Sequence, residues 1–316
     1  MSVKTDFRET HPLIKRSASA TLGLIDNLLL KAAGRLNRLS NRIAATKAMY
    51  VDFVPRPSDV FIVTYPRSGT VLMQMLLYQM TTDGNMEFSH ITEACPYLER
   101  AFTNRRDLEA LPPPRIFKTH FLLSMICNGP GKCIYVARDG RDVAVSYYYF
   151  HKNGRGFQGT FSEFFDRFLK GDVLYGSWFD HVADGLRYRN NHNVLFLTYD
   201  ELVSNLEGSI KGVGEFCGFE VPPERIPTIL ECCGIEFMRA HAEKFSPATE
   251  IEWYRKIKER QIMRNDNDRT SVRRRGACGG WKEYLSDQEI IRYDRRLEEK
   301  LDRPLWGNLK ERAADR

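Results

Sequence analysis

The sequence predicts a single α/β domain in which a doubly wound, central parallel sheet is flanked by helices. Four short runs rich in β-branched and aromatic residues, at 60–64, 115–119, 133–137 and 194–198, alternate with stretches of helical periodicity. Each run is nearly continuous in hydrophobicity, as expected for parallel strands buried on both faces. The chain has 316 residues, 42% of them hydrophobic and 28% charged, which is enough to bury such a sheet.

A basic helical extension over residues 1–54 precedes the main domain, which we expect over 55–316. Within the extension, residues 20–48 predict a helix, because apolar side chains recur at alternating steps of three and four. Docking on its own domain, self-association and contact with a membrane surface are all open roles for this helix. The two prolines of "VPRPSD" at 54–59 end any helix before the first strand.

The main domain continues from the first strand into a helix at 69–80. Periodicity predicts further helices at 141–151, 161–170, 177–190, 205–217 and 287–300. Residues 240–270 are highly charged and have little periodic apolar signal after 260, which favours a lid over the site.

Charge and cysteine usage exclude several classes of protein. Residues 1–50 hold nine basic and three acidic residues, whereas the rest of the chain holds 38 of each, so no nucleic-acid-binding surface is expected. The seven cysteines include no C-x-x-C pair, which argues against a zinc site or a disulfide framework. The charged first residues do not resemble a signal peptide, and no run of about 18 apolar residues occurs. We therefore expect a cytoplasmic protein without a metal.

Polar residues follow every predicted strand, at the edge where ligands of open parallel sheets bind. The first strand leads into a turn that can bind an anion, because a helix N-terminus supplies unpaired N–H groups and Gly69 allows close approach. Lys118 and His120 lie on the same side of the second strand end, where a histidine can serve as a general base. Arg138 and Tyr199 follow the third and fourth strands.

Each of these features also has an ordinary structural interpretation. Ser68-Gly69-Thr70 fits a plain helix cap, an isolated histidine is usually a core or surface residue, and the arginines at 273–275 fit a solvated charge run. A nucleotide kinase or NTPase begins with a similar strand, turn and helix, but GxxxxGK[ST] is absent. A non-catalytic interaction protein on the same fold is a third alternative.

Four motifs taken together, in this order, resemble the cytosolic-type sulfotransferase family. They are "TYPRSGT" (64–70), "KTH" (118–120), "YVARDGRDVAVSYYYF" (135–150) and "RRRGACGGWK" (273–282), and the likeness runs from about 59 to 282. The resemblance implies transfer of a sulfuryl group from 3′-phosphoadenosine 5′-phosphosulfate (PAPS) to a hydroxyl or amine of a small molecule. The second product would be 3′-phosphoadenosine 5′-phosphate (PAP).

The resemblance also implies roles for individual residues. His120 would be the base, Lys118 would contact the transferring group, and Arg67 would stabilise the leaving group. The residues implied to bind the donor are Arg67, Ser68, Gly69 and Thr70 at the 5′-phosphosulfate, Arg138, Ser146, Arg274, Arg275 and Gly276 at the 3′-phosphate, and Val71, Leu72, Tyr199, Cys233 and Ile235 near the adenine. The residues expected to line an acceptor pocket are Phe88, His90, Tyr97, Phe121 and the run from Tyr147 to Phe150, although aromatic side chains at these spacings also fit a core.

The chain departs from the family pattern at three points. Arg67 stands where the family usually has lysine, which keeps the charge but changes a point donor into a planar fork. Leu72 replaces a tryptophan that often stacks on adenine, so apolar packing is expected there instead. The segment "KEYLSDQEII" (282–291) lacks the family's short dimerisation motif, and that mode of association is not expected.

Overall fold

The structure, a computed structural model, describes residues 53–82, 84–101, 108–154, 156–246 and 278–301. In these ranges β1 (Val60–Thr64), β2 (Ile116–Thr119), β3 (Lys132–Ala137) and β4 (Val194–Thr198) form one sheet in the order β2-β1-β3-β4. All neighbouring strands in it are parallel. The predicted parallel sheet is confirmed, and each strand lies within one residue of its predicted range. The predicted helix at 20–48 and most of the predicted lid lie outside the described residues.

Six helices of the described ranges correspond to predicted ones. They are α2 (Thr70–Thr81), α4 (Gly140–Gly154), α5 (Phe161–Lys170), α6 (Trp178–Arg187), α8 (Leu206–Cys217) and α12 (Asp287–Lys300). Capping boxes begin two of them, Thr160 with Glu163 at α5 and Ser286 with Glu289 at α12. Four short helices were not predicted, namely α3 (Leu98–Ala101), α7 (Tyr199–Ser204), α9 (Ile226–Cys233) and α10 (Ile235–Ala240).

The predicted helix at 177–190 is three residues too long at its C-terminal end. α6 stops at Arg187, and the chain then turns through two backbone hydrogen bonds, Arg189 N–H to Leu186 O and Asn191 N–H to Tyr188 O. The sequence from 189 to 193 is rich in asparagine, which favours turns over helix interiors. These residues bring the chain back to the start of β4.

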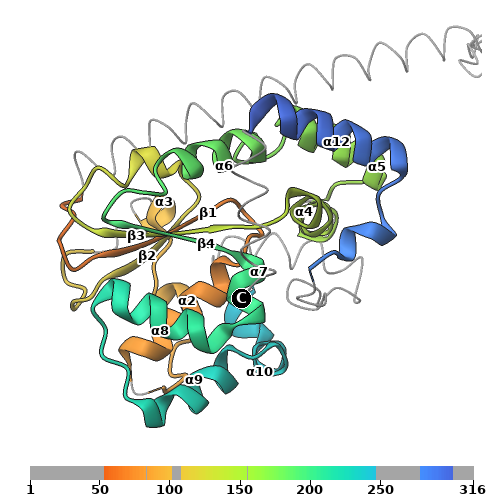
Figure 1. The fold of residues 1–316 in the computed structure, drawn as a ribbon. Coiled ribbons are helices and arrows are strands. Elements are labelled where there is room, and N and C mark those ends of the chain that lie inside the picture. The colour runs from red at the N-terminus through yellow and green to blue at the C-terminus, as the bar shows by residue number, and fades with distance from the viewer. Residues whose placement is uncertain (1–52, 83, 102–107, 155, 247–277, 302–316) are drawn as a thin grey trace, which may run out of the picture.

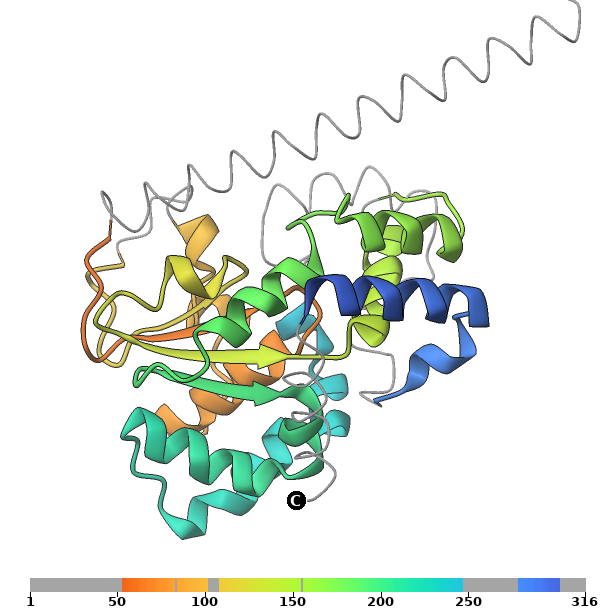
Figure 2. The ribbon, with the colours of Figure 1, turned by 45° about the horizontal axis from the view of Figure 1, so that its top comes forward.

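Two hydrophobic cores lie on opposite faces of the sheet. Alternate residues of β1 divide between them, Phe61 and Val63 to one and Val60 and Ile62 to the other. The first core packs against α4, α5, α6 and α12, and the second against α2, α8, α9 and α10 (Figure 1, Figure 2). Among the described residues no helix is both long enough and apolar enough to cross a membrane.

A buried ion pair ties the start of β1 to the start of β2. Arg115 Nε and Nη2 donate to the two carboxylate oxygens of Asp59 at 2.8 and 2.7 Å, and both side chains are 0% exposed. We expect Arg115→Lys to lower the free energy of unfolding by about 2 kcal/mol, because lysine keeps the charge but cannot form both bonds. Urea unfolding measures this change.

The matched control is Arg292→Lys, at the ion pair of Arg292 with Asp166. Those side chains are 45% and 43% exposed, so we expect a loss below about 0.5 kcal/mol. Equal losses in the two variants would contradict a special contribution from the buried fork.

Candidate functional site

The carboxyl ends of the four strands meet at one edge of the sheet, because the strands are parallel and in register. Val63 pairs with Thr119, Thr64 with Val136, and Ala137 with Thr198. The residues that follow each strand are therefore neighbours in space. Figure 1 shows α4 and α7 beginning at this edge.

The turn after β1 is shaped by two residues in the left-handed region. Arg67 has φ 73°, and Gly69, the N-cap of α2, has φ 98°. A Cβ on Gly69 would lie 2.7 Å from Cδ2 of Tyr199, so glycine alone lets the turn approach the end of β4. The hydroxyl of Ser68 is buried and has no hydrogen-bond partner among the described residues. The turn thus presents a buried donor at a helix N-terminus.

Two arginines meet beside this turn. Nε of Arg67 donates to Oγ of Ser146 in α4 at 2.9 Å, and Nη1 of Arg138 donates to the carbonyl oxygen of Arg67 at 3.1 Å. Burial, and next to it the charge of Arg138, lower the pKa of Arg67 to about 10. The structure therefore brings together Arg67, Ser68, Arg138 and Ser146, which lie on two separate motifs of the sequence.

Four of the five residues predicted near the adenine belong to one core or pack against it. Tyr199 lies 9% exposed beneath the guanidinium of Arg138, whose Cζ is 4.3 Å from the ring centre, and Cys233 belongs to the same core. Val71 and Leu72 pack against that core from the first turn of α2. Ile235 is 42% exposed at the start of α10. Nε of Arg138 is buried and has no hydrogen-bond partner in the described part of the chain.

His120 is oriented by the end of β1. Its Nδ1 lies 2.8 Å from the carbonyl oxygen of Thr64 and 3.3 Å from Thr64 Oγ1, which is itself 2.7 Å from Thr70 Oγ1. Because a carbonyl oxygen can only accept, Nδ1 carries the proton, and a neutral imidazole then has its lone pair on Nε2. This is the protonation state that a general base needs.

Lys118 and His120 both contact Tyr97, one of the residues expected to line the acceptor pocket. Nζ of Lys118 is 4.7 Å from the centre of the Tyr97 ring, and the rings of Tyr97 and His120 lie 5.4 Å apart. Tyr175 packs against His120 from its other side, at 5.1 Å between ring centres, and its hydroxyl is hydrogen-bonded to that of Tyr97. The two phenols enclose the imidazole.

Two carboxylates at the strand ends were not among the predicted site residues. Oε1 of Glu99 accepts the backbone N–H of His120 at 2.7 Å. Asp142 in α4 accepts the backbone N–H groups of Gly279 and Trp281 at 2.8 and 3.1 Å, and so anchors the late glycine-rich motif next to the strand ends. The predicted donor-binding residues Arg274, Arg275 and Gly276 lie outside the described residues, directly before this anchor.

Four other residues predicted at the acceptor pocket, Phe88, His90, Phe121 and Tyr147, form two separate pairs. Phe121 and Tyr147 belong to one core, and the Tyr147 hydroxyl donates to the carbonyl oxygen of Leu174 at 2.6 Å. Phe88 belongs to the opposite core, and His90 caps a short 3₁₀ helix by accepting from Thr92 N–H at 3.2 Å. The structure does not bring these two pairs together.

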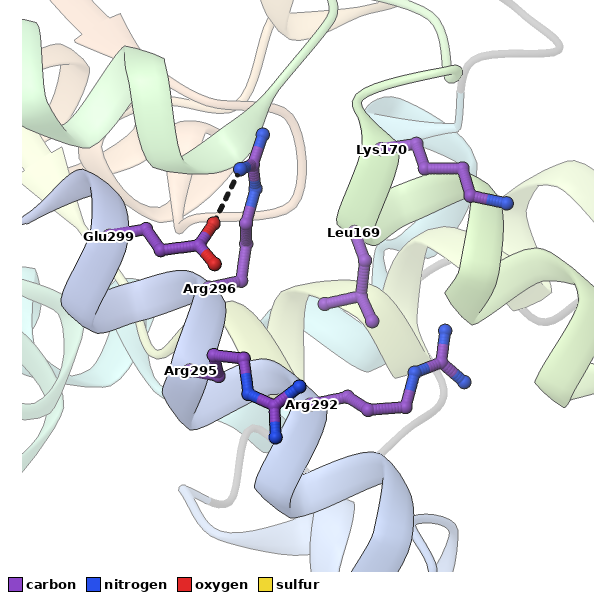
Figure 3. Close-up of a pocket in the computed structure, with 6 residues that line it drawn as sticks. All are labelled: Leu169, Lys170, Arg292, Arg295, Arg296 and Glu299. Atoms are coloured by element: carbon purple, nitrogen blue, oxygen red, sulfur yellow. Dashed lines mark hydrogen bonds and ion pairs between the residues drawn. The ribbon is translucent and has the colours of Figure 1, made fainter.

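An open groove between α5 and α12, of about 370 Å³, is lined by none of the predicted site residues (Figure 3). Two of its cations, Arg292 and Arg296, are already paired with Asp166 and Glu299. The anion site is therefore better sought at the strand ends. In the described ranges no three His, Cys, Asp or Glu side chains are arranged as metal ligands.

Comparison with known proteins identifies similar sequences over most of the chain. A family model described as a sulfotransferase domain matches residues 57–304. Sulfotransferase 1B1 of Mus musculus is 32% identical over 257 residues, which cover 77% of this chain and 82% of that protein. Sulfotransferase 4A1 of Mus musculus is 38% identical over 191 residues, covering 58% and 67%.

Solved structures show the same fold. Mouse sulfotransferase SULT7A1, crystallised with PAP, superposes with a TM-score of 0.67 at 25% identity and covers 85% of this chain and 93% of that one. A retinol dehydratase in complex with androsterone and inactive cofactor PAP gives a TM-score of 0.66 at 24% identity, covering 83% and 86%. The second likeness is one of fold alone.

Proposed function

The chain belongs to the sulfotransferase family and is a sulfotransferase, and from that premise we propose its donor, its acceptor class and the residues that act. The donor is PAPS, and the acceptor is a hydroxyl or amine of a small molecule. The proposed reaction needs no metal. The protein is proposed to work in the cytoplasm.

The observation that carries the proposal is the convergence of Arg67 and Arg138 beside the buried Ser68 hydroxyl, which has no hydrogen-bond partner in the part of the chain that the structure describes. Burial, and next to it the charge of Arg138, lower the pKa of Arg67, so holding both charges here is costly unless an anion lies close to both. A donor with phosphate groups at both ends of its ribose supplies such an anion. Arg67, Ser68, Gly69 and Thr70 would hold the 5′-phosphosulfate, and Arg138 and Ser146 the 3′-phosphate.

PAPS supplies a sulfur that is open to attack and a phosphate leaving group. As the acceptor oxygen or nitrogen bonds to sulfur, the bond from sulfur to the phosphate oxygen breaks and PAP leaves with its electron pair. Nε2 of His120 takes the proton that the acceptor loses, since Nδ1 already donates to Thr64. Lys118 and Arg67 stabilise negative charge on the sulfuryl oxygens and the departing phosphate. No covalent enzyme intermediate is required.

Calorimetry with PAP, followed by PAP-release assays with PAPS, tests this function. We expect PAP to bind more tightly than adenosine 5′-phosphate, because that nucleotide has no group for Arg138 to hold. The acceptor panel contains phenols, steroids, glycolipids and amines, and at least one of them should release PAP. Absence of PAP affinity, or tight binding of ATP with Mg²⁺ instead, would contradict the proposal.

A further inference from the structure

The strand end that carries Lys118 and His120 is paired on its outer side by residues 96–99. β2 is the edge strand of the described sheet, so its outer backbone groups need another partner. Lys118 N–H donates to the carbonyl oxygen of Pro96 at 2.9 Å, and Tyr97 and Lys118 form a parallel bridge. This segment therefore fixes the backbone at the residues proposed to act on the sulfuryl group.

Glu99 extends this contact with a charged side chain. Its Oε1 accepts the His120 N–H at 2.7 Å, and its Oε2 is buried. Burial raises the pKa of Glu99 to about 7, although hydrogen bonds from His120 N–H and the Thr119 side chain and the charge of Lys118 all act to lower it. The carboxyl group is thus held where its ionisation is costly.

Packing alone does not require a carboxylate at this position. A glutamine side chain would offer the same acceptor oxygen to His120 N–H and would avoid burying a charge. What a glutamine could not provide is a negative charge that acts on the Lys118 ammonium group and lies at the backbone of His120. The charge of Lys118 favours the ionised form of Glu99, so a carboxylate can influence the charge at this strand end as well as accept the hydrogen bond.

We propose that Glu99 is a positioning residue for sulfuryl transfer, which holds the backbone of His120 and sets the charge around its imidazole. This inference rests on the proposed function. A carboxylate favours the imidazolium form of a nearby histidine, so Glu99 makes His120 a stronger base. The polar groups that contact the imidazole are Thr64 at the end of β1, Tyr97 on the 96–99 segment and Tyr175 from the loop after α5, and Lys118 lies against the Tyr97 ring.

An NMR titration of the protein without substrate tests the charge effect. We expect the His120 imidazole to titrate about 0.5 to 1 pH unit lower in Glu99→Gln than in the wild type, since the favourable charge is lost. The His120→Ala spectrum assigns the resonance. The matched control is Glu93→Gln, because Glu93 Oε2 also accepts a backbone N–H, that of Ser89 at 3.1 Å, but Glu93 lies on the 3₁₀ helix that precedes the 96–99 segment. This control should leave the His120 titration unchanged.

Kinetics with the best acceptor test the positioning effect. Glu99→Ala removes both the hydrogen bond and the charge, and we expect kcat to fall about 10- to 100-fold with PAP affinity within about twofold. Glu99→Gln should recover most of kcat at alkaline pH, and the acidic limb of its pH profile should move to lower pH. A purely structural role would lower the melting temperature without moving that limb.

The outcomes separate this inference from the function on which it rests. An unchanged His120 titration in Glu99→Gln, or a kcat within about twofold of wild type in Glu99→Ala, would overturn the role of Glu99 while sulfuryl transfer stands. A wild-type protein that binds no PAP would overturn the proposed function instead. The NMR comparison needs no substrate, so it decides in either case whether Glu99 sets the state of His120.

Discussion

His120→Ala is expected to lower kcat for sulfuryl transfer by about 10² to 10⁴, with PAP affinity within about twofold of wild type. The physical reason is that the acceptor must lose its proton as it attacks sulfur, and the variant has no imidazole to take it. PAP binding should persist, because the proposed donor contacts come from the 65–70 turn and Arg138 instead. Release of PAP under saturating PAPS measures kcat, and calorimetry measures PAP affinity.

The matched control for this variant is His192→Ala. His192 is exposed in the turn before β4, at the opposite edge of the sheet from the strand ends. Its removal should leave both kcat and PAP affinity unchanged. If His120→Ala kept near-wild-type turnover, the base would have to be another group or bulk water, and the assignment would be wrong.

The sheet was predictable because β1, β2 and β3 are almost wholly buried on both faces. Every residue of β1 is buried, and so are all but the first residue of β3, which makes each a nearly continuous apolar run in the sequence. The short helices α3 and α9 were not predictable in the same way. α3 has four residues, too few for a periodic pattern. α9 buries Ile229, Cys232 and Cys233 at helical spacing, but it has only eight residues and carries Pro227 in its first turn, so its signal is weak.

The site was predictable where it follows a strand and not where it depends on tertiary pairing. Arg67, His120 and Arg138 are found from the sequence because each comes just after an apolar run. Glu99 gave no such signal, since its hydrogen bond to His120 forms only when the 96–99 segment pairs with the end of β2, through the bridge between residues 97 and 118. The proton position on His120 likewise depends on the Thr64 carbonyl, 56 residues earlier in the chain. Contacts at that separation leave no local pattern.

Arg138→Ala is expected to weaken PAP binding by about 10- to 100-fold, because the variant loses one charge-assisted hydrogen bond to a phosphate. Arg138 follows β3, and its guanidinium lies over Tyr199 and donates to the backbone of Arg67, so it joins three of the four strand ends. Its buried Nε has no partner among the described residues, which leaves a donor for a ligand. Calorimetry at one fixed salt concentration measures the loss.

Two further variants decide whether that loss comes from the phosphate contact or from charge in general. Arg295→Ala removes a cation from the groove between α5 and α12 (Figure 3) and should leave PAP affinity unchanged, because the proposed donor site is local. Arg138→Lys keeps the charge but loses the planar fork, so its affinity for PAP should fall between those of the wild type and Arg138→Ala.

A comparison with adenosine 5′-phosphate shows which part of the donor Arg138 contacts. If Arg138 holds the 3′-phosphate, Arg138→Ala should weaken PAP binding and barely affect binding of adenosine 5′-phosphate. Equal weakening of both ligands would mean that Arg138 acts through the turn at Arg67, whose carbonyl oxygen it holds, and not on the 3′-phosphate.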